Sequence, residues 1–185
     1  MNTVTIRPYR DGDCPYVQKI CIETAGSRFV KTPRKQRAAA AAFCRYFIER
    51  CPETCFVAVN ESDEPVGYIL CTPTFGRWCR YAPEQFGVGF PYAFLWSLGS
   101  MSGAVPYLKN YPAHLHINLL PPYQRMGLGR KLMQTLEEAL RQRNCPGVSL
   151  CLGKDNHGAQ LFYESCGFKK LGKHPGAVAY GKILE

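Results

Sequence analysis

Two glycines and several basic residues form a short segment in the second half of the chain. Residues Pro121–Gly129 read PPYQRMGLG, and Arg130 and Lys131 follow directly. Without side chains, Gly127 and Gly129 let the backbone approach a ligand and let successive N–H groups point into one concavity. A helix that begins there adds unpaired N–H groups and the positive end of its dipole. The segment therefore predicts a diphosphate site, and a plain strand-to-helix turn is the alternative.

Two other phosphate-binding loops fit this segment less well. The dinucleotide-binding loop needs GxGxxG, and here Leu132 stands where the last glycine would be. The Walker loop needs Gly-Lys-Ser/Thr, which is missing.

Hydrophobic periodicity shows which elements would position the loop. Residues His114–Leu120 alternate and predict a strand before it. After it, apolar residues on one face predict a helix that ends at Asn144–Gly147. The remaining elements expected are a strand at Val148–Leu152, a short helix capped by Asn156 and closed by Gly167, and two strands at Phe168–Leu171 and Val178–Leu184.

The first part of the chain predicts one strand, two helices and a hairpin. We expect the strand at Val4–Arg7, a helix after Asp11–Asp13, and a second helix from Thr32 that stops before Pro52. The apolar runs Cys55–Val59 and Val66–Cys71 predict an antiparallel hairpin. Residues 73–112 are rich in Gly, Pro and aromatic residues, with a helical hint at 91–98. The sequence thus indicates one domain, residues 1–185, with a variable insertion at about 73–112.

Composition narrows the function without deciding it. The chain has 185 residues, 46% of them hydrophobic, which is enough for one core. No run reaches the roughly 18 apolar residues of a membrane span, and the first residues do not resemble a secretory signal. We expect a cytoplasmic protein that does not bind membranes.

Charge and cysteine content add two further expectations. The net charge of +9 favours polyanionic partners. The basic run at 31–37 suggests a nucleic-acid-binding protein as one alternative, but no standard binding motif accompanies it, so no nucleic acid is expected. The ten cysteines lack metal-site spacing. Most are expected to be small buried residues, and no metal is predicted.

Two motifs resemble those of one superfamily. Residues Gln124–Gly129 resemble the Q/R-x-x-G-x-G/A motif of the GCN5-related N-acetyltransferase (GNAT) superfamily. Asn156, Ala159, Tyr163 and Gly167–Phe168 resemble its N-x-x-A-x-x-x-Y-x-x-x-G-F pattern, in the expected order. Residues 111–117 resemble microbial relatives of the acetyltransferase-like domain of O-GlcNAc hydrolases. The resemblance implies an α/β (α+β) fold, with a mixed, mostly antiparallel sheet of six to seven strands, splayed at the middle and flanked by about four helices.

The resemblance also implies a reaction. An acetyl group would pass from acetyl-CoA to an amine, a small molecule or a protein amine, by direct attack through a tetrahedral intermediate. The pantetheine would lie along His114–Leu120, and the N–H of Leu119 or Leu120 would hold the thioester oxygen. The cofactor-binding residues expected are Leu119, Leu120, Gln124, Arg125, Met126, Gly127, Leu128, Gly129, Arg130 and Asn156.

Three residues are candidates for proton transfer. Tyr163 matches the tyrosine that in many family members faces the CoA sulfur and protonates the leaving thiolate; the alternative is a half-buried core tyrosine. His114 and His116 share one face of the predicted strand with Asn118, and their ordinary pKa of about 6.5 suits a base. Either histidine can equally be structural, and two histidines without a third ligand do not predict a metal site.

Several questions stay open at this level. A catalytically weak or inactive CoA-binding or interaction domain of the same fold is the main alternative. The acceptor would be selected by residues 28–37 and 73–112. The sequence does not distinguish a monomer from a homodimer.

Overall fold

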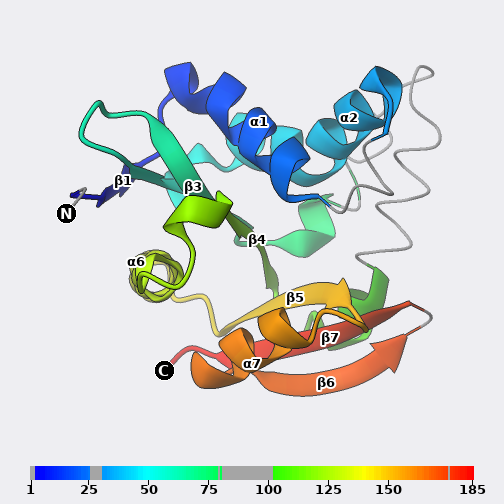
Figure 1. The fold of residues 1–185 in the computed structure, drawn as a ribbon. Coiled ribbons are helices and arrows are strands. Elements are labelled where there is room, and N and C mark those ends of the chain that lie inside the picture. Colours follow the sequence, from blue (N-terminus) through cyan, green and yellow to red (C-terminus); the bar gives the residue numbers. More distant parts are fainter. Residues whose placement is uncertain (1–2, 26–30, 79, 81–101, 175) are drawn as a thin grey trace.

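The protein is described by a computed structural model that covers residues 3–25, 31–78, 80, 102–174 and 176–185. Its centre is a seven-stranded sheet with the order β1-β2-β3-β4-β5-β7-β6, and helices lie on both faces (Figure 1). Within this sheet, β4 and β5 run parallel and the other neighbours run antiparallel. The expected fold class, a mixed and mostly antiparallel sheet flanked by helices, is confirmed.

The elements follow the predicted order. The strands are β1 Thr5–Pro8, β2 Phe56–Val59, β3 Pro65–Thr72, β4 Ala113–Leu119, β5 Gly147–Gly153, β6 Lys169–His174 and β7 Ala177–Ile183. The helices are α1 Cys14–Thr24, α2 Pro33–Ala40, α3 Tyr46–Arg50, α6 Leu128–Arg141 and α7 His157–Ser165.

One face of the sheet is covered by α1 and by the helix that runs from Pro33 to Arg50. The Thr32 hydroxyl accepts the Lys35 N–H at 3.3 Å and so caps this helix, as its sequence predicts. Between α2 and α3 the helix widens into a π-helical turn, Ala41–Arg45, a distortion that is frequent at functional sites. Small buried alanines on α2 allow it to pack closely against α1.

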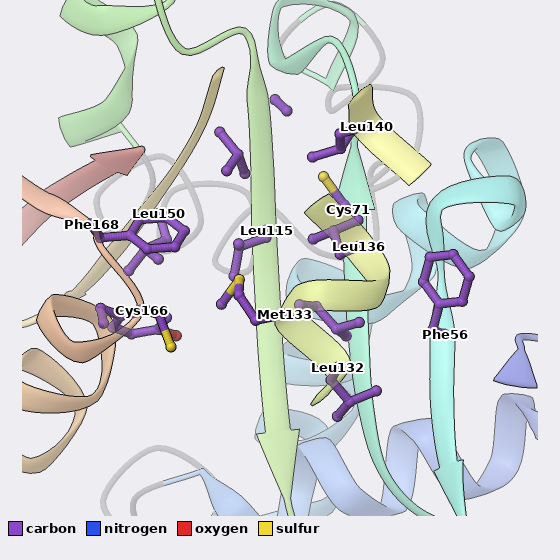
Figure 2. Packing of buried hydrophobic residues seen from close by; sticks show 14 of the residues in the cluster. Phe56, Cys71, Leu115, Leu132, Met133, Leu136, Leu140, Leu150, Cys166 and Phe168 are labelled. Carbon is purple, nitrogen blue, oxygen red and sulfur yellow. The ribbon is translucent and has the colours of Figure 1, made fainter. Parts of the chain in front are cut away.

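The opposite face is covered by α6 and α7. The buried face of α6 packs on β2, β3 and β4, and Figure 2 shows it between strand residues that include Phe56, Cys71 and Leu115. The α6 residues in this core are Leu132, Met133, Leu136, Ala139 and Leu140. They are the residues whose helical spacing predicted this face.

Polar contacts tie α6 and α7 to β7. The carboxylate of Glu137, 8% exposed, accepts a 2.7 Å bond from Lys182. The Tyr180 hydroxyl donates to Glu164 on α7 at 2.9 Å. These contacts join both helices to β7, in the half of the sheet that contains β5.

Part of the segment at 73–112 belongs to the core. Phe75 and Trp78 are 1% exposed and stack with ring centres 5.1 Å apart, and a 3₁₀ turn, Ser102–Tyr107, lies against β5, β6 and β7. The helix suggested at 91–98 and the aromatic residues between positions 81 and 96 lie outside the described residues. Within the described chain, no helix has the length and apolar character needed to cross a membrane.

Candidate functional site

The central strands β4 and β5 separate soon after they begin. Their paired residues are Ala113 with Val148 and His114 with Ser149. In contrast, β4 pairs with β3 as far as Leu119. Beyond His114, β4 therefore has a paired strand on one side, and its other side opens towards the diverging β5.

Every second residue of β4 directs its main-chain groups to this open side. Residues of an antiparallel ladder alternate between those that bond to the partner strand and those that point away from it. The Leu120 N–H donates to the Val66 carbonyl at 2.9 Å. By alternation Asn118 also bonds to β3, whereas Ile117 and Leu119 face the opening. Of the two amides expected to hold a thioester oxygen, that of Leu120 is engaged in the sheet and that of Leu119 faces the open side.

The turn after β4 carries a row of unpaired N–H groups. Arg125 and Gly127 both have positive φ, 60° and 77°. The first N–H of the following helix to find a backbone acceptor is that of Lys131, which donates to the Gly127 carbonyl at 3.1 Å. Within the described chain, the N–H groups of residues 125–130 donate no hydrogen bond that the structure records. Such a row at a helix N-terminus is a ready anion-binding site.

The two glycines of the turn are required for different reasons. A Cβ added to Gly127 would meet nothing within 4 Å, so this position is open to a ligand. A Cβ added to Gly129 would lie 3.1 Å from the Phe162 ring and 3.6 Å from Leu119. Gly129 thus lets α6 approach α7, a packing reason that the sequence analysis did not foresee. Its expected contact with a ligand stays a prediction.

Side chains of the turn mainly fix the backbone around it. The Gln124 amide donates to the Leu119 carbonyl at 2.8 Å. Arg130 donates to the carbonyl and hydroxyl of Ser165 at 3.0 and 3.1 Å, which ties α6 to the end of α7. Leu128 is buried, and Met126 is 53% exposed. The predicted cradle is therefore a backbone surface held by Gln124 and Arg130.

Both ends of helix α7 are capped by the predicted residues. The Asn156 side chain accepts the Ala159 N–H at 3.2 Å and caps its start, and Gly167, with φ of 86°, closes its end. The expected contact of Asn156 with pantetheine is a separate prediction.

Tyr163 on α7 belongs to the buried cluster that also contains Leu115 of β4 and Leu150 of β5. The side chain is 8% exposed and lies edge-on to Phe162 and Phe168. Burial raises its pKa, so the phenol keeps its proton at neutral pH. Among the described residues, its hydroxyl makes no hydrogen bond that the structure records. The oxygen is nevertheless not completely enclosed by protein atoms, so a ligand can reach it.

His116 lies on the opposite face of β4, under the π-helical turn. Its Nδ1 is 3.2 Å from the Tyr68 hydroxyl, its ring stacks on Phe43 with centres 5.2 Å apart, and it also hydrogen-bonds to the backbone of Phe43. Burial lowers its pKa to about 4. The imidazole is thus neutral at neutral pH, and both sides of the ring are occupied.

His114 lies where β4 and β5 are still paired. It is 3% exposed, its ring stacks on Phe75 with centres 4.6 Å apart, and its Nδ1 is 3.4 Å from the Ser149 hydroxyl. Burial, with a smaller contribution from His116, lowers its pKa to about 3. The structure therefore brings the two histidines to one face of β4 but places His114 in the core, away from the open part.

Tyr68 is the residue of this site that the sequence analysis missed. It lies in the apolar run of β3 and is fully buried, and its hydroxyl contacts both His116 and Asn118. The sequence does contain a signal for it. A tyrosine in an otherwise apolar strand indicates a polar partner nearby, because a buried phenol needs a hydrogen bond. Among the described residues, no group of three or more His, Cys, Asp or Glu is placed to hold a metal ion.

Known proteins share this fold over nearly the whole chain. The crystal structure of SsHAT has 28% sequence identity and a TM-score of 0.87, with 99% of each chain covered. An acetyltransferase of the GNAT family from Staphylococcus aureus Mu50 has 14% identity and a TM-score of 0.64, covering 99% of this chain and 100% of its own. A structure of the NatC complex bound to Gag peptide and CoA has 16% identity and a TM-score of 0.61, with 98% and 97% covered.

The match in sequence includes both motifs. Residues 19–168 match the Acetyltransferase (GNAT) family. This stretch runs from α1 to the end of the second motif and contains the separated strands, the glycine turn and α7. The chain belongs to the GNAT acetyltransferase family.

Proposed function

We propose that this protein, as one domain spanning residues 1–185, transfers an acetyl group from acetyl-CoA to an amine. The row of unpaired N–H groups at residues 125–130 carries this proposal. It lies at the N-terminus of α6, directly after the strand whose open side would receive an extended ligand. The family supports acyl transfer from acetyl-CoA in general, and the amine acceptor is the specific part of the proposal.

Main-chain groups of the described residues would bind such a co-substrate. The N–H groups of residues 125–130 bind the pyrophosphate, and the open space above Gly127 admits it. The Leu119 amide on the open side of β4 binds the thioester oxygen and stabilises the negative charge that develops on it. Bound acetyl-CoA supplies an activated acyl carbon. The NatC complex, one chain of which has a similar fold, was crystallised bound to Gag peptide and CoA.

Tyr163 is proposed as the acid that protonates the departing thiolate. Burial raises the pKa of the phenol and keeps its proton in place. The same surroundings would also raise the pKa of a thiol, because burial disfavours any anion. The proton can therefore still move from the phenol to the sulfur as the sulfur gains charge.

Neither histidine is well suited to remove the amine proton. His116 and His114 are neutral at neutral pH, as a base must be, but their low pKa makes them weak bases. The hydrogen bonds of His116 also occupy both sides of its ring. This observation favours one alternative function, a domain that binds CoA with little or no transfer.

The anion cradle is tested by placing a carboxylate in it. We expect Gly127→Glu to lower acetyl-CoA affinity at least about a hundredfold, because its charge opposes the pyrophosphate and its side chain enters the open space. The positive φ adds a strain of about 1 kcal/mol. Isothermal titration calorimetry with acetyl-CoA measures the affinity.

Gly12→Glu is the matched control for that variant. Gly12 is also a glycine with nothing within 4 Å of an added Cβ, and it lies in a turn before α1. This variant should bind acetyl-CoA like the wild type. Wild-type affinity in Gly127→Glu, with an intact fold by thermal unfolding, would contradict the cradle.

Removal of the Tyr163 hydroxyl tests the proposed acid. Tyr163→Phe should lower kcat by about a hundredfold and leave the Kd for acetyl-CoA within about twofold. Thiol release is followed with a panel of amines: spermidine, glucosamine, 2-phenylethylamine and a lysine-containing peptide. Tyr9→Phe changes a tyrosine of similar burial, 9% exposed, beyond β1 and should leave kcat unchanged. Equal kcat in Tyr163→Phe and Tyr9→Phe would remove Tyr163 from the mechanism.

The pH dependence tests the histidines. Because burial lowers the pKa of His116 to about 4 and of His114 to about 3, both stay neutral from about pH 5.5 upwards. We expect kcat/KM to rise with pH as the amine, with a pKa of about 10.4, loses its proton, without a bend near about pH 6.5. The rates of wild type and His116→Gln are compared from about pH 5.5 to about pH 9. A bend near about pH 6.5 that His116→Gln abolishes would show instead that His116 titrates as a solvated base.

A further inference from the structure

A chain of hydrogen bonds runs beneath the open part of β4, on the face covered by α1 to α3. It starts at the backbone of Phe43 in the π-helical turn and passes through His116 to Tyr68. It ends at Asn118, whose Nδ2 donates to the Tyr68 hydroxyl at 2.9 Å. The Tyr68 side chain is fully buried, and those of His116 and Asn118 are half-buried.

The direction of this chain can be inferred from the bond between His116 and the Phe43 backbone, together with the position of Nδ1 beside Tyr68. The hydrogen bond with the Phe43 backbone raises the pKa of His116, so the backbone group is an acceptor, a carbonyl oxygen. It requires an N–H on the ring nitrogen that faces it. In the neutral imidazole Nδ1 then carries the lone pair. Tyr68 must donate its proton to Nδ1, and its oxygen is left to accept the Asn118 N–H.

Two thiols also lie within reach of the Tyr68 hydroxyl. The Cys44 thiol donates to it across 3.9 Å, which does not compete for its proton. Cys21 can accept from it, but sulfur is a weak acceptor compared with an imidazole nitrogen. The Tyr68 hydroxyl therefore donates its proton to His116 in preference to Cys21.

These hydrogen bonds fix the orientation of the Asn118 side-chain amide through the buried Tyr68 hydroxyl. With its Nδ2 directed to Tyr68, Asn118 presents Oδ1 on the other side of its amide group. Within the described chain, Oδ1 accepts no hydrogen bond that the structure records. The oxygen is not completely enclosed by protein atoms, so a ligand can reach it. It is an unused acceptor next to Leu119, the residue whose amide faces the opening.

The geometry points to Asn118 as the residue that binds the acceptor amine, with Oδ1 accepting one of its N–H groups. This inference rests on the proposed function. Tyr68 belongs to the buried cluster under α1 to α3, and Tyr163 to the cluster under α6 and α7. Asn118 and the proposed acid thus lie on opposite faces of the sheet. An amine held by Asn118 would attack from one face, and the thiolate would be protonated from the other.

The chemistry of Oδ1 indicates the class of acceptor. A primary amine can donate one N–H to an amide oxygen and still direct its lone pair at the acyl carbon. A full negative charge at this position would instead favour the protonated ammonium, which cannot attack. The neutral amide therefore suits a neutral primary amine. Tyr68 and His116 act through Asn118 and are positioning residues.

The test combines steady-state kinetics with binding of acetyl-CoA. With saturating acetyl-CoA and varied 2-phenylethylamine, or the panel amine that the wild type acetylates fastest, Asn118→Leu should raise the amine KM about tenfold, the effect of one lost hydrogen bond. Tyr68→Phe should raise it in the same direction, and the double variant should add little. The Kd for acetyl-CoA should stay within about twofold of wild type in all three. Tyr46→Phe, a buried tyrosine outside the chain of hydrogen bonds, controls for the loss of a core hydroxyl.

A charge substitution at Asn118 distinguishes a role in binding the amine from a structural role. Asn118→Asp retains an acceptor oxygen but adds a negative charge, so it should move the rise of kcat to higher pH by stabilising the bound ammonium. A purely structural role for Asn118 predicts no such displacement.

Nitrogen NMR of the imidazoles tests the direction of the chain without an acceptor. We expect His116 neutral at pH 7, with its proton on the nitrogen facing Phe43 and none on Nδ1. A proton on Nδ1 would reverse the chain and overturn the inference, as would an unchanged amine KM in Asn118→Leu. If the wild type binds acetyl-CoA but acetylates none of the amines, the proposed function fails and the inference with it.

Discussion

The separation of β4 from β5 is the constraint on which the rest of the site depends. A strand that loses its neighbour leaves N–H and C=O groups without partners, and such groups are costly unless water or a ligand satisfies them. Here the separated part of β4 keeps its ladder with β3, so the cost falls on alternate residues along one side. Those same groups can bind an extended amide-containing ligand as an additional strand would. The unsatisfied edge and the proposed binding site are thus one feature.

Rigid packing around the opening keeps it from closing. Gly129 allows α6 to approach Phe162 closely, and Arg130 joins α6 to the end of α7. The Gln124 side chain engages the Leu119 carbonyl on the open side, which leaves the Leu119 amide as the free group there. Each contact fixes backbone rather than presenting a side chain to a ligand. A site built of main-chain N–H groups needs such support, because its precision is that of the elements that carry it.

Sequence periodicity predicted the order of the elements and the resemblance to the GNAT superfamily predicted the fold, but neither predicted the detailed contacts around the proposed cradle. The face of α6 and the hairpin of β2 and β3 could be predicted because their patterns are local. The choice between the Leu119 and Leu120 amides could not, because it depends on which residue of β3 lies opposite. The packing role of Gly129 depends on Phe162, far along the chain. The contacts of Tyr68 join residues 48 and 50 positions apart, a separation at which hydrophobic spacing carries no information.

The two faces of the opening differ in electrostatic character, and the difference matches the chemistry proposed for each. On the face of α7, a buried phenol with a raised pKa retains a proton that it can give to an anion. On the face of α1 to α3, two neutral histidines and a fixed amide present dipoles rather than charges. A dipole can orient an N–H group without strongly favouring an ammonium ion over the free amine. An amine that binds there therefore gains little from remaining protonated. In the active enzyme that we propose, its proton would be lost to solvent before attack, so the weak basicity of the two histidines does not by itself exclude transfer.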